Sequence, residues 1–166
     1  MRRLFTPWRM SYIRGLVKKD KGCVFCDKNE ADDEQELVIA RSKYVYVVMN
    51  KYPYSNGHLM VVPYEHIPTQ ETMSAEALTD LMMMMNKAIA VLRKQCYPSG
   101  FNIGANLGST AGAGIAEHFH FHIVPRWESD VNFITVLGGT RIIPDTLENT
   151  HKELKSIWKD LYEKEK

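Results

Sequence analysis

The stretch HFHFHIVPRW, residues 118–127, constrains this chain most, because histidines occupy every second position at its start. Successive side chains of a β-strand point to opposite faces of the sheet. We therefore expect His118, His120 and His122 on one face and the intervening apolar residues on the other. Buried imidazoles cost free energy unless each finds a partner. One histidine would fit a core position satisfied by backbone groups, but three at this spacing predict a cleft or a metal.

The composition narrows the classes of protein that remain. The chain has 166 residues, enough for one domain with a real core, with 45% hydrophobic and 25% charged residues. Its net charge of +1 gives no strong field for nucleic acid or an anionic membrane. No apolar run approaches the roughly 20 residues of a membrane span, and the basic N-terminus lacks the apolar region of a signal peptide. We expect a cytoplasmic protein that binds neither nucleic acid nor membrane.

Strand and turn signals predict an α+β fold with a mainly antiparallel sheet of about five strands. Short runs of β-branched and aromatic residues, bounded by Pro, Gly and Asn, predict strands at 36–40, 43–50, 58–63, 101–108 and 118–126. No repeat or linker interrupts the chain, so one domain is expected over residues 1–166. Within it we distinguish an N-terminal segment at 1–34, a core at 35–126 and a C-terminal extension at 127–166.

Apolar residues at helical spacing predict a long helix within 72–96 and a terminal helix within 144–166. Ser74 is the expected N-cap of the long helix, and its run of four methionines is interpreted as filling gaps in the core. The side chains expected to face inward are Leu78, Leu81, Met82, Met85, Ile89 and Leu92 in the long helix, and Leu147, Leu154, Ile157, Trp158 and Leu161 in the terminal helix. Cys96 is expected in the core and His151 at the surface.

Two kinds of chemistry fit three alternating histidines. They can bind a catalytic metal, or one imidazole can act as a nucleophile that its neighbours orient. The loop GANLGSTAGAGIAEH, which ends at His118, favours the second chemistry. Its small residues allow backbone N–H groups to converge on phosphate oxygens, although it matches neither a P-loop nor a dinucleotide fingerprint. Beside a potential nucleophile, such a loop indicates phosphorus chemistry.

Cys23 and Cys26 form a Cys-x-x-Cys pair in a chain that has three cysteines in all. Three cysteines cannot form a complete disulfide framework. In a reducing compartment such a pair is typical of metal binding or redox chemistry. The residues alone leave both alternatives open.

These motifs together resemble the HIT, or histidine triad, superfamily. EHFHFHIVPR resembles its alternating-histidine motif, and VVMNKYPYSNGHLMVVPYEHI, residues 47–67, resembles its nucleotide-binding strand pair. PWRMSYI, the Cys-x-x-Cys pair, GFNIGANLGSTAGAGIAEH and PRWESDVNFITVLGGTRIIP resemble the branch of bacterial diadenosine tetraphosphate phosphorylases. The resemblance implies a HIT-like fold and a homodimer formed by extending the sheet across a two-fold axis.

The resemblance also implies roles for single residues. HIT enzymes transfer a nucleotidyl group through a covalent histidine intermediate. His120 would attack the α-phosphorus, and His122 would hydrogen-bond the phosphate oxygens as charge shifts. Asn50 matches a ribose-contacting position, and His58 would support the triad by hydrogen bonding or would be a purely structural strand histidine. The remaining substrate-binding candidates, on the phosphate side and in the flanking loop, are Asn106, Gly112, Gly114 and Ile115.

In zinc-bearing HIT members, two cysteines and two histidines bind the metal. The matching residues are Cys23, Cys26, His66 and His118. Two thiolates and two imidazoles make a closed tetrahedral set, which is structural rather than catalytic. No βαβ pattern of a thioredoxin-like protein surrounds the cysteines. Zinc is therefore favoured over a redox pair and would attach the N-terminal segment to the catalytic strand.

One departure from the family pattern concerns the second nucleophile. HIT hydrolases and phosphoramidases usually carry Gln-Ser or Gln-Thr shortly before the triad, where this chain has Gly114 and Ile115. A smaller residue leaves room for inorganic phosphate, so we expect phosphorolysis of diadenosine tetraphosphate to ATP and ADP. The alternatives are hydrolysis of dinucleoside polyphosphates or of adenine mononucleotide phosphoramidates, a non-catalytic nucleotide-binding module, and a hydrolase with a metal on the three histidines. The sequence does not indicate whether a divalent cation accompanies the substrate.

Overall fold

The computed structural model describes residues 22–29, 31–128, 130–131, 133–139 and 142–163. The PWRMSYI motif and most of the segment expected at 1–34 lie outside these residues. The described strands form one five-stranded sheet in the order β1-β2-β3-β5-β4, and each strand is antiparallel to its neighbours. They are β1 (Val38–Arg41), β2 (Val45–Met49), β3 (Leu59–Pro63), β4 (Gly100–Gly104) and β5 (Phe121–Arg126). The expected α+β fold is confirmed.

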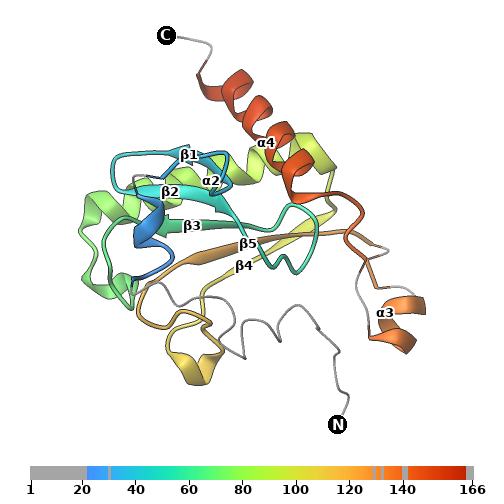
Figure 1. Ribbon diagram of the computed structural model, residues 1–166, viewed down its shortest axis with the longest axis horizontal. Coiled ribbons are helices and arrows are strands. Elements are labelled where there is room, and N and C mark those ends of the chain that lie inside the picture. The colour runs from blue at the N-terminus through green and yellow to red at the C-terminus, as the bar shows by residue number, and fades with distance from the viewer. Residues whose placement is uncertain (1–21, 30, 129, 132, 140–141, 164–166) are drawn as a thin grey trace.

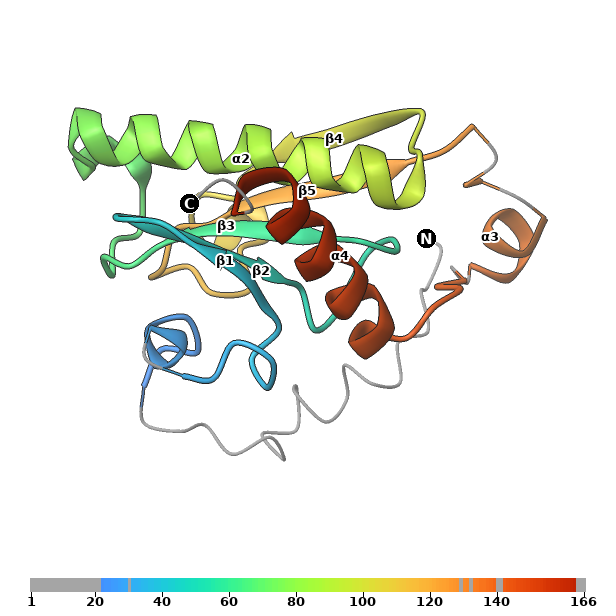
Figure 2. The same cartoon turned by 90° about the horizontal axis from the view of Figure 1, so that it is seen from above.

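Helices cover one side of the sheet. The long helix α2 (Ala75–Cys96) packs on β2 and β3, and α4 (Leu147–Tyr162) packs against both α2 and β1. Figure 2 shows α2 on the opposite side of the sheet from the blue turn near the described N-terminus. A short helix not expected from the sequence, α3 (Phe133–Gly138), stands apart from the sheet in both views (Figures 1 and 2). Short 3-10 turns lie at η1 (Cys26–Lys28), η2 (Gln70–Thr72) and η3 (Ser109–Ala111).

Two apolar clusters lie on the two faces of the sheet. The larger joins α2 and α4 to one face and includes Phe119, Ile123 and the half-buried Phe121, as the alternating pattern predicts. The smaller one consists of Phe25, Val38, Tyr46, Val48, Met60 and Val62, with half-buried Cys23, Tyr64 and Ile115 packed against it. We call residues 23–28 the cysteine turn. This turn and the loop that contains Ile115, residues 105–117, therefore cover the face that the helices leave open.

The long helix begins as expected but faces the core differently within its methionine run. The Ser74 hydroxyl accepts a hydrogen bond from the Ala77 N–H at 3.1 Å, which confirms the N-cap. Met84 and Met85 are 3% and 5% exposed. Met82, expected in the core, is 47% exposed and Met83 is 54% exposed, so only half of the methionine run fills the core, contrary to the interpretation of the run as a whole. The inward stripe instead runs through Leu81, Met84, Met85, Ala88, Val91 and Leu92.

Two expectations for the terminal helix were wrong. Leu161 was expected to face inward but is 39% exposed. His151 was expected at the surface but is 3% exposed, and its Nε2–H donates to the Val38 carbonyl at 2.9 Å. Val38 lies where the register between β1 and β2 shifts, at an irregularity between Val38 and Ala40. The buried histidine thus satisfies a carbonyl at this irregular position of the ladder.

The last core strand is shorter than the predicted 118–126, since β5 begins at Phe121. Its neighbour β3 ends at Pro63, which has no N–H to donate to a longer ladder. The Pro63 carbonyl instead accepts a hydrogen bond from the His118 side chain at 2.9 Å. The first two histidines of the motif therefore precede the strand. Among the described residues, no helix has both the length and the apolar character needed to cross a membrane.

Candidate active site

Three imidazoles gather where β3 begins beside β5. The ring centroids of His120 and His122 are 4.8 Å apart, and those of His58 and His122 are 5.1 Å apart. His122 lies on β5 opposite Met60, which places His58, just before β3, next to it. His58 is fully buried and His120 is 7% exposed, whereas His122 is half-buried. His58 is thus in direct contact with His122, as its expected supporting role requires.

A chain of hydrogen bonds fixes the protons of this cluster. The Tyr54 backbone N–H donates to His58 Nδ1 at 3.1 Å, so this nitrogen is an unprotonated acceptor. His58 then carries its proton on Nε2 and donates it to His122 Nδ1 at 2.9 Å. His122 must in turn carry its proton on Nε2. The arrangement makes His122 a hydrogen-bond donor toward any group beside its Nε2.

The opposite tautomer is set at His120. Its Nδ1 lies 2.9 Å from the carbonyl oxygen of His118, an acceptor that requires an N–H. The lone pair of the neutral ring therefore lies on Nε2, which is the nitrogen that can attack an electrophile. The two rings, two residues apart in the sequence, thus differ at Nε2: His120 has a free lone pair there and His122 has an N–H.

Burial keeps these rings neutral. Burial, with smaller contributions from His122 and His120, lowers the pKa of His58 to about 3. Burial and then His120 lower the pKa of His122 to about 4. Burial also lowers the pKa of His120. A neutral His120 retains the lone pair that nucleophilic attack requires.

The depressed pKa values of His58 and His122 predict acid destabilisation. Between pH 6.5 and about 4 the unfolded chain binds protons that the folded rings reject, so the free energy of unfolding should fall as pH falls. Each unit of pKa difference corresponds to about 1.4 kcal/mol. Urea unfolding from pH 7.5 to pH 4.5 measures the slope. The matched variant His58→Gln keeps an N–H donor but does not titrate, so its slope should be shallower; equal slopes in both proteins would contradict this assignment.

The four residues predicted to bind zinc also lie close together. The ligand atoms of Cys23, Cys26, His66 and His118 all lie within 4.8 Å of one another. The Nδ1 atom of His118 lies 3.3 Å from Cys23 Sγ, and that of His66 lies 3.3 Å from Cys26 Sγ. Ligands of a tetrahedral zinc are separated by about 3.3–3.8 Å, given its bond lengths of about 2.0–2.3 Å. The four side chains can therefore hold a metal ion.

The hydrogen bond of His118 prepares this ring for a metal. Its Nε2–H donates to the Pro63 carbonyl at 2.9 Å, which leaves Nδ1 unprotonated and facing the two sulfurs. Metal-binding histidines commonly donate their other N–H to such an acceptor, which fixes the ring orientation. The described residues contain no other group of at least three His, Cys, Asp or Glu side chains with metal-binding spacing. A catalytic metal on all three motif histidines is not favoured, because His118 is directed at the cysteines.

The remaining predicted site residues are placed less directly. Asn50 follows β2; its Oδ1 accepts from the Tyr52 N–H at 2.8 Å, and its Nδ2 is 3.4 Å from His58 Nδ1. Asn106 is exposed, with Nδ2 at 3.5 Å from the carbonyl oxygen of Gly112, which has a positive φ of 91°. At Gly114 an added Cβ would meet no atom within 4 Å. Their contacts with substrate stay a prediction.

Two residues at the site were missed from the sequence. Tyr54 supplies the N–H that sets the His58 tautomer, and its ring centroid lies 4.7 Å from that of His58. Phe25 lies in the cysteine turn, and its ring centroid is 4.8 Å from that of His120. Its place inside the Cys-x-x-Cys pair was the available signal for Phe25. For Tyr54 the contribution is a backbone group, which the residue type does not indicate.

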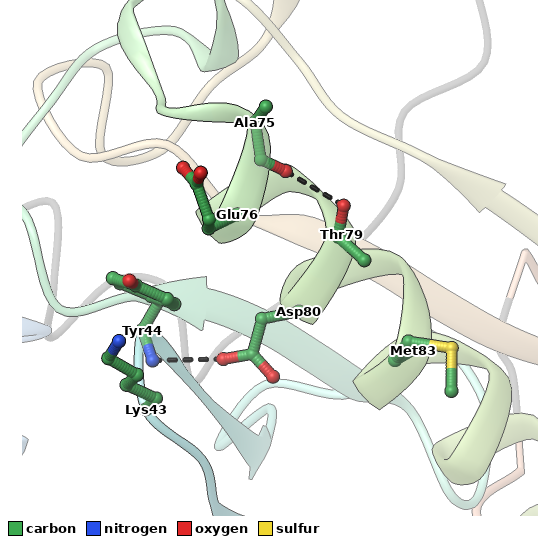
Figure 3. A pocket seen from close by; sticks show the side chains of 7 residues that line it. All are labelled: Lys43, Tyr44, Ala75, Glu76, Thr79, Asp80 and Met83. Carbon is green, nitrogen blue, oxygen red and sulfur yellow. Dashed lines mark hydrogen bonds between the residues drawn. The ribbon is translucent and has the colours of Figure 1, made fainter.

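A pocket elsewhere on the surface contains none of these residues. It lies between the β1–β2 turn and the first turns of α2 and is lined by Lys43, Tyr44, Ala75, Glu76, Thr79, Asp80 and Met83 (Figure 3). The Asp80 carboxylate accepts hydrogen bonds from the Tyr44 N–H at 2.9 Å and the Ser42 hydroxyl at 2.7 Å. These bonds tie the turn to the helix, so the acidic residue has a structural role there.

Comparison with known proteins identifies the family. The family model described as "HIT domain" matches residues 31–129, more than half of the chain. The chain belongs to the HIT family. It is 44% identical over 165 residues to a Mycobacterium tuberculosis protein named "AP-4-A phosphorylase", covering 95% of this chain and 85% of that protein. It is 26% identical over 135 residues to an adenosine 5'-monophosphoramidase of Saccharomyces cerevisiae, covering 81% of this chain and 82% of the relative.

Solved HIT structures share the architecture. A zinc-bound histidine triad family protein from Mycobacterium smegmatis superposes with a TM-score of 0.69 at 23% identity, covering 87% of this chain and 99% of that one. At this identity the similarity shows the fold alone. Both the antiparallel sheet and the helices expected from the HIT resemblance are thus confirmed.

Proposed function

We propose that this protein transfers an adenylyl group from diadenosine tetraphosphate to inorganic phosphate through His120 and releases ATP and ADP. The observation that carries the proposal is the hydrogen bond between His120 Nδ1 and the His118 carbonyl, which leaves Nε2 as a neutral nucleophile. The choice of substrate rests on the 44% identity to a relative named AP-4-A phosphorylase. The relatives also include an adenosine 5'-monophosphoramidase and an asymmetrical bis(5'-nucleosyl)-tetraphosphatase, so hydrolysis of phosphoramidates or of dinucleoside polyphosphates is the second candidate.

In the first step, His120 Nε2 forms a bond to the α-phosphorus while the bond from that phosphorus to the bridging oxygen breaks. ATP leaves with the electron pair of the broken bond. The imidazole becomes positively charged, and its Nδ1–H remains bonded to the His118 carbonyl, which stabilises that charge. The Nε2–H of His122 donates to a phosphoryl oxygen as negative charge accumulates there.

In the second step, a phosphate oxygen attacks the same phosphorus, ADP forms, and neutral His120 is regenerated. Splitting one displacement into two easier ones is the general advantage of covalent catalysis. The open space at Gly114 supports phosphate as the acceptor, because an added side-chain atom there would meet nothing within 4 Å. The half-buried Ile115 side chain packs against the smaller apolar cluster, so we expect its backbone to be the part that contacts phosphate.

Filling the space at Gly114 should affect the acceptor more than the first step. We expect Gly114→Gln to lower the rate of phosphorolysis about tenfold or more while adenylylation of His120 changes little, because the new side chain occupies the room left for phosphate. Single-turnover kinetics with and without phosphate separate the two steps. Ala113→Gln, on the neighbouring half-buried residue, is the control for a bulky side chain in this loop. An unchanged phosphate dependence in Gly114→Gln would contradict the role of Gly114 in making room for phosphate.

Product chromatography tests the proposed function as a whole. Diadenosine tetraphosphate is incubated with the protein, with and without inorganic phosphate. ATP and ADP formed only with phosphate are expected. AMP and ATP formed without phosphate would make the protein a hydrolase, and the absence of turnover in both cases would support phosphoramidates or a binding role.

We further propose that the Cys23, Cys26, His66 and His118 cluster holds structural zinc. A closed set of two thiolates and two imidazoles suits zinc and leaves no open position for substrate. Bound there, the metal would link the cysteine turn to His118, just before the catalytic strand. The compartment that we propose is the reducing cytoplasm, in which thiolate ligands persist.

We propose a homodimer that forms through the β4 edge of the sheet. β4 is the last strand in the sheet order, and Asn102, Ile103 and Gly104 on it are exposed. An exposed edge strand offers backbone groups to a second copy. Replacing Ile103 with lysine should shift the mass measured by light scattering from dimer to monomer, whereas an unchanged mass would place the interface elsewhere.

A further inference from the structure

Phe25 connects the two groups of predicted site residues. It lies between Cys23 and Cys26 and is 3% exposed. Its ring centroid is 5.3 Å from that of His118, in an edge-on arrangement, and 4.8 Å from that of His120, tilted by 49°. One aromatic ring thus contacts both a proposed metal ligand and the proposed nucleophile.

The position of Phe25 is fixed by its backbone as well as its ring. Its carbonyl oxygen accepts a hydrogen bond from the buried Tyr46 hydroxyl at 2.8 Å. Its side chain belongs to the smaller apolar cluster on the sheet face opposite the helices. The Asp27 N–H donates to the Cys23 carbonyl at 3.0 Å, which closes the cysteine turn around Phe25. The ring is therefore a rigid wall of the site.

We propose that Phe25 is a positioning residue that holds the His120 imidazole in its attacking orientation, and that metal in the cysteine turn keeps Phe25 in place. The proposal rests on the proposed function of His120 and of the Cys/His cluster. The hydrogen bond from Nδ1 to the His118 carbonyl anchors one edge of the ring, and the His122 ring lies against it in a T-shaped arrangement with centroids 4.8 Å apart. The Phe25 ring, tilted by 49° to the imidazole, packs against it from the cysteine turn and limits its rotation. Misplacing a reacting atom by about 1 Å can lower a rate about 100-fold.

The kinetic test replaces Phe25 with leucine or methionine, which keep most of the buried apolar volume without the flat ring. We expect the rate of His120 adenylylation to fall about 10- to 100-fold, because the nucleophile is less well oriented. Substrate affinity should change by about twofold at most, because Phe25 acts through His120. Zinc per chain, measured by atomic absorption, should be unchanged. Val24→Ala is the matched control, since Val24 lies in the same turn but is 54% exposed.

A second readout does not depend on activity. Imidazole ¹⁵N–¹H spectra at a fixed pH of about 7.5, at which the ring is neutral, report the Nδ1–H of His120. In the wild-type protein its bond to the His118 carbonyl should protect this proton from exchange. We expect the signal to broaden in Phe25→Leu and Phe25→Met, and in the wild-type protein after zinc is chelated, but not in Val24→Ala.

These outcomes separate the inference from the proposed function. One outcome is that the wild-type protein forms no adenylyl adduct while the His120 signal still broadens in the Phe25 variants. In that case the proposed function fails and the positioning role stands. If a folded Phe25 variant retains a sharp His120 signal and an adenylylation rate within about twofold of wild type, the inference is overturned, even where its thermal stability is lower. Thermal unfolding identifies which variants are folded, and either folded variant decides the question.

Discussion

Replacing His120 with alanine is expected to lower turnover of diadenosine tetraphosphate by at least about 10⁴-fold, the scale of loss seen when a covalent nucleophile is removed. The proposed nucleophile is Nε2 of a neutral ring whose Nδ1 is bonded to the His118 carbonyl. No other imidazole of the cluster can replace it, because His122 carries its proton on Nε2 and His58 uses both nitrogens in hydrogen bonds. Initial rates followed by chromatography measure the loss.

The fold should survive this substitution. His120 faces the smaller apolar cluster and Phe25, whereas the larger core lies on the other side of the sheet. Zinc content should therefore match the wild type, and the unfolding midpoint should fall by only a few degrees. His151→Gln is the matched control, because His151 is a buried histidine outside the site and glutamine keeps a donor for the Val38 carbonyl. Residual turnover of His120→Ala above about 1% of wild type would assign the nucleophile elsewhere.

Replacing Cys26 with serine is expected to have the largest effect on stability. Loss of one thiolate opens the proposed zinc set, and structural zinc contributes on the order of 10 kcal/mol of binding free energy to such small sites. The cysteine turn also covers one face of the sheet through Phe25, so its release would expose the smaller apolar cluster. We expect the unfolding midpoint to fall by about 10 °C or more, with less than one zinc bound per chain.

The third cysteine provides the control for this experiment. Cys96 lies at the end of α2, is half-buried, and its thiol donates to the Leu92 carbonyl at 3.3 Å. Cys96→Ser keeps a donor at this position and removes no proposed ligand. It should retain full zinc content and lose little stability. A Cys26→Ser protein with the stability and zinc content of the wild type would contradict the structural metal site.

The periodic parts of this fold could be predicted from the sequence. Alternating residues identified the faces of β5, and the Ser74 cap and the helical stripe located α2, because each signal depends on neighbours in the chain. The Cys/His cluster was expected from the HIT resemblance, and the structure brings its four ligand atoms together. These features follow from local spacing or from a family pattern.

The errors arose where distant segments decide the outcome. His151 is buried because an irregularity in the β1–β2 ladder leaves it the Val38 carbonyl as a partner. No pattern in the sequence around His151 predicts this irregularity. The start of β5 depends on Pro63 in another strand. The tautomer of His58 depends on the backbone N–H of Tyr54. Such contacts become visible only when the chain is folded.

Mass spectrometry of the protein during the reaction tests the central claim most directly. The protein is mixed with diadenosine tetraphosphate without phosphate, quenched within milliseconds under conditions that preserve phosphorus–nitrogen bonds, and digested. We predict an adduct of one adenylyl group on the peptide that contains His120, which disappears when phosphate is added and yields ADP. An adduct on another residue, or turnover with phosphate and no adduct at any time, would contradict covalent transfer through His120.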